Sequence, residues 1–154
     1  MKNKQTGVAL VEFALVLPLL LILTFIVTEY SRALYQYNTL TKSVRDAARY
    51  LSIQTPYDAT KYAIAKNLVV FGNPAGSGAP LAIGLTKIAQ VPNPVWKWEG
   101  AAPKINTVTI QVGYGPTGTA AQNYTFIPLV ASVFGLNFSN LPYAPISATM
   151  RAPS

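Results

Sequence analysis

An almost wholly apolar run, Val8 to Thr28, constrains this chain more than any other feature of its sequence. The run reads VALVEFALVLPLLLILTFIVT and contains a single charged residue, Glu12. As a helix it would extend about 31 Å, enough to cross a hydrocarbon core about 30 Å thick. Residues 1–7 are polar and carry two lysines. The positive-inside rule therefore predicts a cytoplasmic leader over 1–7, a transmembrane helix over 8–28 and an exported remainder.

A cleaved secretory signal is the alternative interpretation of this run. Its apolar region would span about 7–15 residues and would end at a small-x-small cleavage site. The run here is longer, and residues 28–31 offer no such site. The sequence therefore favours a retained helix, in which Pro18 is a tolerated kink, with a functional hinge as the alternative. Just beyond it, Tyr30 and Arg32 are expected to act as anchors at the membrane exit, where tyrosine is favoured.

Residues 29–52 contain no helix breaker, so the membrane helix should continue through them as one spine. Apolar residues recur at the three- and four-residue spacing of an amphipathic helix: Ala33, Tyr37, Leu40, Val44, Ala47, Ala48 and Leu51. The opposite side carries three basic residues: Lys42, Arg45 and Arg49. We interpret the basic side as a solvated face, with a surface for a partner or for phospholipid headgroups as the alternative. The apolar stripe is expected to hold an exported globular head, residues 53–154.

The head should begin with a short helix. Thr55, Pro56 and Asp58 suit the N-cap, the first and the third positions of a helix. The helix should run to about Val70 and end near Gly72.

Strands are expected to follow this helix. Four stretches have strand character: Leu85–Val91, Val95–Trp98, Asn106–Tyr114 and Ile146–Arg151. The third alternates cleanly, with Val108, Ile110 and Val112 on one face. Residues 115–118 should turn the chain. Residues 126–136 are apolar throughout but too short to span a bilayer, so we expect a buried or interfacial helical segment there.

These elements predict an α+β protein, with a long N-terminal hydrophobic α-helix and a small head. The head would contain a short helix and a mostly antiparallel β-sheet packed on the long helix. Trp96 and Trp98 would point to the same face of a strand. We interpret the pair as packing in the core or between subunits, with sugar or base stacking as the alternative.

Composition excludes several classes of protein. The chain has no His and no Cys. It therefore has no imidazole or thiolate metal site, no disulfide and no Ser–His–Asp or Cys–His nucleophile. Its net charge is +7, but the basic residues are scattered and much of the excess reflects having only 5 acidic residues. This pattern argues against nucleic-acid binding. No motif supports a Ser–Lys dyad, so we expect neither enzymatic activity nor a cofactor.

The N-terminal sequence resembles a known family. Gly7 followed by VALVEF resembles the class III leader of type IV pilins and pseudopilins. The longer stretch from residue 7 to about 52 resembles the TadE-like family, which comprises minor pilins or pseudopilins of the tight-adherence (Flp) pilus. The resemblance rests on ALVEFALVLPLLL, on Glu29-Tyr30-Ser31-Arg32 and on DAARY at residues 46–50. Beyond residue 52 it is weak, although residues 146–151 are similar to the family's usual last strand.

This resemblance implies a processing site and an assembly site. A prepilin peptidase would cut between Gly7 and Val8, leaving Glu12 at the fifth position of the mature chain, followed by Phe13. The carboxylate of Glu12 could then pair with the new α-amino group on Val8 of a neighbouring subunit. Such pairing would offset the cost of burying both charges and would fix the register of the subunits. From the residues alone, Glu12 could equally reach the cytoplasmic interface from near the helix start.

The resemblance also implies partners and a location. The partners would be the bacterial inner membrane, prepilin peptidase, other pilin-like subunits and the Tad-type assembly machinery, with the subunit forming a homo- or hetero-oligomer in a filament. The head would be exported, to the periplasm or to the cell exterior in a pilus. Two alternatives stay open: an uncleaved membrane-anchored scaffold or adhesive protein, and the main subunit of a filament. The size of the head favours a minor subunit, because the major Flp pilins are very short.

Overall fold

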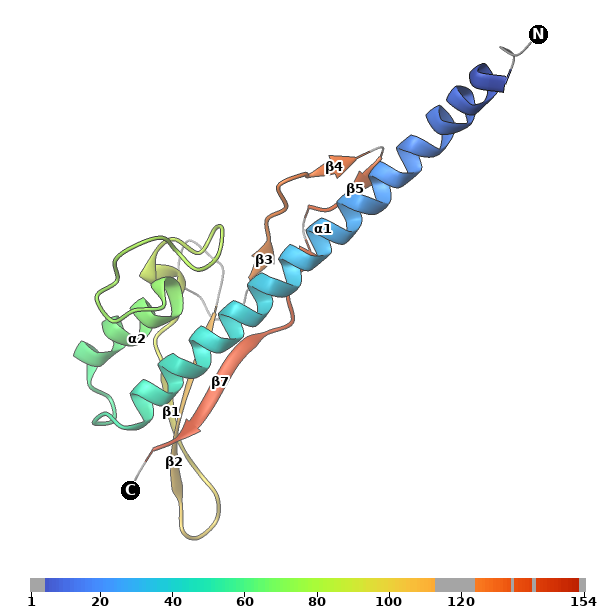
Figure 1. The fold of residues 1–154 in the computed structure, drawn as a ribbon. Helices are drawn as coiled ribbons and strands as arrows, with labels where there is room; N and C mark the ends of the chain where they lie inside the picture. The colour runs from blue at the N-terminus through green and yellow to red at the C-terminus, as the bar shows by residue number, and fades with distance from the viewer. Residues whose placement is uncertain (1–4, 113–123, 134, 140, 153–154) are drawn as a thin grey trace.

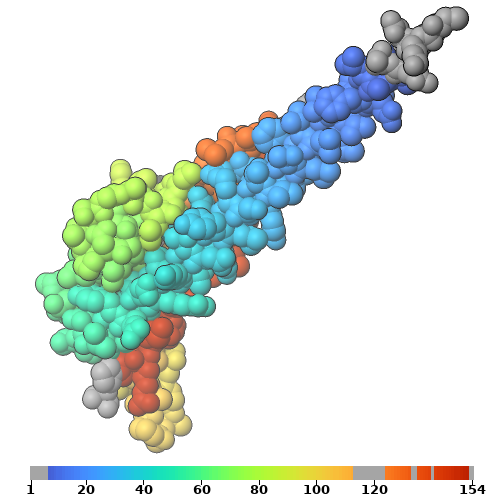
Figure 2. All heavy atoms as spheres, in the orientation of Figure 1, coloured from blue at the N-terminus to red at the C-terminus, as the bar shows by residue number. Residues whose placement is uncertain are grey.

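The computed structural model describes residues 5–112, 124–133, 135–139 and 141–152 of the chain (Figure 1). One long helix projects from a head that gathers around its C-terminal half (Figure 2). In chain order the elements of the described residues are α1 (Gln5–Ser52), α2 (Ala59–Phe71), a 3₁₀ turn η1 (Ile88–Gln90), β1 (Val95–Glu99), β2 (Ile105–Val112), β3 (Thr125–Phe126), β4 (Ser132–Val133), β5 (Leu136–Asn137), β6 (Leu141–Pro142) and β7 (Ile146–Arg151). The predicted α+β fold, with a long spine helix and a small head, is confirmed.

Helix α1 runs without interruption from the apolar segment into the head, as predicted, and continues past Pro18. Several hydroxyl groups along α1 each donate a hydrogen bond of 2.7–2.9 Å to the backbone carbonyl four residues earlier. The donors are Thr24, Thr28, Ser31, Thr39 and Thr41. These bonds satisfy the hydroxyl hydrogens within the helix itself. The apolar segment can therefore include Thr24 and Thr28 without leaving their donors unpaired in lipid.

The predicted apolar stripe on the second half of α1 is confirmed. Five of its residues are fully buried: Leu40, Val44, Ala47, Ala48 and Leu51. The stripe contacts α2, β2 and β7, so the core of the head lies between the helix and these elements. The three basic residues on the opposite side are exposed: Lys42, Arg45 and Arg49. Burying the stripe against the head therefore leaves the charges of this half in solvent.

The predicted start of α2 is wrong. Asp58, not Thr55, is the N-cap, and its carboxylate accepts hydrogen bonds from the backbone N–H and the hydroxyl of Thr60 at 2.9 and 2.7 Å. Pro56 lies outside the helix, in a turn that the Asp58 N–H closes on the Thr55 carbonyl, with Tyr57 at a φ of 66°. The carboxylate of Asp58 accepts both hydrogen bonds, so the helix starts after Asp58 instead of Thr55.

The predicted end of α2 is confirmed. Gly72 adopts a φ of 71° and its N–H bonds to the carbonyl of Leu68. A side chain at this glycine would be strained by the backbone and would also meet Leu81 at 3.3 Å. Ala65, Val69 and Val70 are buried in the core that α2 shares with α1.

The main sheet has the order β1-β2-β7, and both pairings are antiparallel. In β2 every second residue is buried, so Val108, Ile110 and Val112 share the core face as predicted. Strands β1 and β7 also occupy the predicted positions. The two strands of the β3–β6 pair and of the β4–β5 pair run antiparallel as well. Residues 113–123, which include the end of the third predicted strand and the predicted turn at 115–118, lie outside the described residues.

The strand predicted over Leu85–Val91 is wrong. The segment forms turns and η1, because the side chain of Gln90 binds its own neighbours. Its amide oxygen accepts from the N–H groups of Thr86 and Lys87, and its NH₂ group donates to the carbonyl of Gly84. Those backbone groups therefore form hydrogen bonds within the segment and do not pair with a neighbouring strand.

The helical segment predicted over residues 126–136 is also wrong. The described part contains β3, β4 and β5 instead. Pro128 removes a backbone donor, and Gly135 supplies the positive φ of 83° for the turn that separates β4 from β5. A continuous apolar run suits either structure, because periodicity alone does not distinguish a short helix from short strands.

Candidate assembly helix and helix–head junction

The predicted processing site lies at the start of α1. The helix begins at Gln5, so the peptide bond between Gly7 and Val8 falls within its first turn. Both residues are exposed, and a side-chain carbon added at Gly7 would meet no other atom within 4 Å. The bond is therefore accessible and lies near the described start of α1.

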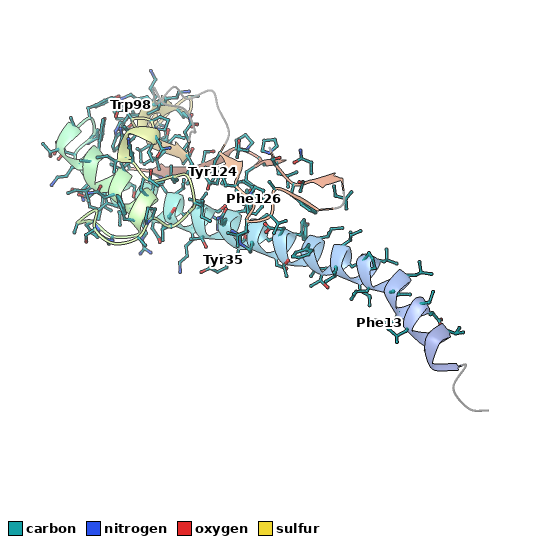
Figure 3. All side chains as sticks on the ribbon, turned by 90° about the horizontal axis from the view of Figure 1, so that it is seen from above. Phe13, Tyr35, Trp98, Tyr124 and Phe126 are labelled. Carbon is teal, nitrogen blue, oxygen red and sulfur yellow. The ribbon has the colours of Figure 1, made fainter. Side chains whose placement is uncertain are left out.

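Glu12 and Phe13 are exposed. Figure 3 shows Phe13 on the stretch of α1 that projects from the head. Glu12 lies one helical turn after Val8, on the same face of the helix. Together with Gly7, Val11 and Leu15, Val8 and Glu12 line a shallow hollow. Among the described residues the one ion pair is formed elsewhere, and the carboxylate of Glu12 lies on a mainly apolar surface.

The apolar stretch of α1 remains largely uncovered by the rest of the chain. Within residues 7–28 all side chains are exposed except those of Ile22 and Phe25, which are half-buried. α1 is long and apolar enough to cross a membrane, and no other helix of the described residues is. Such a surface is stable only in lipid or against other apolar surfaces. The structure thus fits a single-pass membrane anchor.

The helix meets the head at an ion pair that the sequence analysis did not single out. Glu29 is buried, and its carboxylate accepts from the guanidinium of Arg32 at 2.7 Å. Its other oxygen accepts from the backbone N–H of Val130 at 3.3 Å. The guanidinium also lies over the ring of Phe126, 5.6 Å from its centre. Glu29 therefore connects α1 to a segment far along the chain. The sequence could have indicated the Glu29–Arg32 ion pair, because the two residues are three positions apart on one helix face.

Tyr143 extends this junction. Its hydroxyl donates to the carbonyl of Ala33 in α1 at 2.8 Å. Its ring packs against three aromatic residues, with ring centres 5.6–6.3 Å apart: Tyr37, Tyr124 and Phe126. Burial raises the pKa of Tyr143 to about 12, and the charge of Arg32 opposes this shift. Tyr143 is therefore held as a neutral donor.

The predicted anchors Tyr30 and Arg32 have different surroundings. Tyr30 is exposed, with 66% of its surface accessible, as a side chain at a membrane interface would be. Arg32 is half-buried and contacts Glu29 and Phe126. Their role at the membrane exit stays a prediction.

The two tryptophans of β1 differ as well. Trp96 is buried and its ring packs against that of Tyr57, with centres 5.9 Å apart. Trp98, on the same strand face, is 57% exposed at the far end of the head (Figure 3). The interpretation as core packing is confirmed for Trp96.

The N-terminal segment is similar to a known protein family. Residues 7–49 match the family model described as TadE-like protein. This TadE-like segment covers most of α1, including Gly7, Glu12 and the Glu29–Arg32 pair. The match concerns this segment of the chain and fits a membrane-associated pilus component. Searches of the curated proteins and of the solved structures gave no match, so the head is described by its own fold alone.

Proposed function

We propose that this chain is a pilin-like structural subunit of a Tad-type pilus, held in the inner membrane by residues 8–28. The projecting apolar helix with a single carboxylate is the observation that carries the proposal. On this proposal residues 1–7 are a cytoplasmic leader, residues 29–52 continue the helix outside the bilayer, and residues 53–154 are the exported head.

Processing after Gly7 would give the helix its assembly chemistry. A prepilin peptidase would release a free amino group on Val8, one turn from Glu12 on the same face of α1. In lipid or in the core of a filament, each of these charges is costly without the other. Pairing Glu12 of one subunit with the Val8 amine of its neighbour removes both costs and sets how far the helices are displaced along the filament.

Replacement of Glu12 tests this assignment. We expect Glu12→Ala to be processed normally but to enter pili poorly, because the Val8 amine of its neighbour then has no counter-charge. Val11→Ala is the matched control, since it removes apolar surface from the same hollow and no charge. N-terminal sequencing measures processing, and the amount of subunit in sheared pili measures assembly. Normal incorporation of Glu12→Ala would disprove the pairing.

N-terminal sequencing of the native protein separates the remaining functions. A chain that begins at Val8 supports a processed pilin-like subunit. A chain that begins at Met1 in cells with active prepilin peptidase identifies an uncleaved anchored scaffold or adhesive protein instead. A filament composed mainly of this chain would identify it as the main subunit.

A further inference from the structure

The β4–β5 hairpin lies beside the apolar part of α1, outside the main body of the head (Figure 1). Its strands pair Ser132 with Asn137 and residue 133 with Leu136, and the N–H of Phe138 bonds to the carbonyl of Ala131 at 2.9 Å. Figures 1 and 3 both show the hairpin running alongside the helix.

The contacts of the hairpin define its position along α1. The N–H of Val130, just before β4, bonds to Glu29, the first residue after the apolar run. Ile22 and Phe25 are the two half-buried residues of that run, and they share one helix face with Glu29. From Ile22 to Thr28 a helix rises about 9 Å. The covered face of α1 therefore extends about 9 Å into the segment proposed to cross the membrane.

The chemistry of the hairpin region suits this depth. The sequence contains no charged residue between Lys104 and Arg151. Large apolar side chains around the hairpin are exposed, with Leu129 at 74%, Leu136 at 43% and Leu141 at 47%. The surfaces of soluble proteins seldom expose several large apolar side chains next to an exposed apolar helix.

We propose that the β4–β5 hairpin is a second membrane contact, seated in the interfacial region of the outer leaflet beside α1. This inference rests on the proposed function, because it requires α1 to span the bilayer. Interfacial elements bury their apolar side about 5–10 Å into the headgroup–acyl boundary, which is comparable to the roughly 9 Å of the apolar run over which α1 has half-buried residues. Since its polar Ser132 and Asn137 are exposed, the hairpin belongs at the boundary and not in the hydrocarbon core.

Lipid is the occupant that the geometry favours. If α1 spans the bilayer, the surfaces on either side of Ile22 and Phe25 already face acyl chains, and the hairpin continues that surface without a charge. Two contacts with the membrane, one from the helix and one from the hairpin, would fix the rotation of the head about α1. The head would then face the assembly machinery in a single orientation before it enters a filament.

Site-specific labelling tests the proposal, and the absence of native cysteine makes it direct. Single variants Leu129→Cys and Leu136→Cys of the full chain would carry an environment-sensitive fluorophore in phosphatidylethanolamine–phosphatidylglycerol vesicles. Lipids with a spin label near the headgroup serve as quenchers. Ile53→Cys is the matched control, because Ile53 is an apolar residue of the head with 71% exposure at the far end of α1. Leu15→Cys reports on the span itself and is measured with lipids that carry the spin label on the acyl chain, because residue 15 would lie about 10 Å from the nearer headgroup boundary.

We expect the labels at residues 129 and 136 to be quenched several-fold more strongly than the label at 53. Quenching at 15 but not at 129 and 136 would overturn the hairpin contact while leaving the span intact. A lack of quenching at 15 would overturn the proposed anchor and the hairpin contact with it. Labels at 129 and 136 that are shielded from both lipid quencher and aqueous iodide would instead identify a protein occupant, such as a second copy of the chain, and would also overturn the proposal.

Discussion

Tyr143 joins three parts of the molecule through one side chain: its hydroxyl binds α1, and its ring packs against aromatic residues of α1 and of the β3 region. The pKa of Tyr143 is raised from an ordinary 10.0 to about 12. An unfolded chain therefore loses this proton at a lower pH than the folded chain does. The contribution of Tyr143 to stability is fully present below pH 10 and is lost as the pH rises from 10 to 12.

We expect Tyr143→Phe to reduce this loss of stability in alkali. The free energy of unfolding lost through Tyr143 should be about 1 kcal/mol. This is less than a shift of two pKa units would imply for a fully buried group, because the ring keeps contact with solvent. The measurement is the free energy of unfolding in detergent micelles, compared between about pH 9 and about pH 11.5, on either side of the ordinary tyrosine pKa. Tyr35→Phe is the control, since Tyr35 is 73% exposed. An equal alkaline loss in wild type and Tyr143→Phe would contradict the assignment.

Among the elements, α2 gives the clearest test of a helix end. Asp58 accepts two hydrogen bonds from Thr60, and the side-chain bond is the main reason that its pKa is lowered. We expect Asp58→Ala to lower the midpoint of thermal unfolding by a few degrees, because the first turn of α2 loses its cap.

Asp58→Asn is the matched variant for the cap, because asparagine caps helices about as well as aspartate. It should keep most of the stability at neutral pH. In the wild type the contribution of the cap is present above pH 3.8 and is lost as the pH falls through the lowered pKa of Asp58. Asp58→Asn should lack this acid dependence. If the alanine variant unfolds at the wild-type temperature, the cap does not stabilise α2.

Elements in which apolar residues recur at a regular spacing could be predicted from the sequence. Elements whose structure depends on the hydrogen bonds of a single side chain could not. The stripe of α1 and the alternation of β2 each follow one period over many residues, and both are confirmed. The segment around η1 does not form its predicted strand because one amide, Gln90, binds three backbone groups. The apolar run after Thr125 has no period that distinguishes helix from strand, so its hairpin could not be predicted.

The candidate site shows the same division. Glu12 could be singled out because one charge stands alone in an apolar run. The junction of Glu29, Arg32 and Tyr143 joins residues more than a hundred positions apart, so only the fold brings them together. The sequence singled out Arg32 as a membrane-exit anchor, which stays a prediction, but its contact with Phe126 could not be predicted because it follows from tertiary structure.

For the molecule as a whole, α1 is one helix that serves in two different surroundings. Its first half exposes apolar side chains, and its second half buries them against α2 and the sheet. The same substitution should therefore have different consequences at the two ends. Leu40 is fully buried and Leu15 is 75% exposed, so these two leucines form a matched pair.

We expect Leu40→Ala to reduce the free energy of unfolding of the head by about 2–5 kcal/mol, because it leaves a cavity in the core. Leu15→Ala should change it by less than about 0.5 kcal/mol, because its exposed side chain lies on the stretch of α1 that projects from the head. Urea unfolding in detergent micelles, followed by near-ultraviolet circular dichroism, measures both. Vesicle flotation should show that both variants remain membrane-bound, because most of the apolar run is unchanged. Equal destabilisation by the two variants would mean that the projecting half of α1 also stabilises the head, contrary to the division of the helix into a projecting half and a core half.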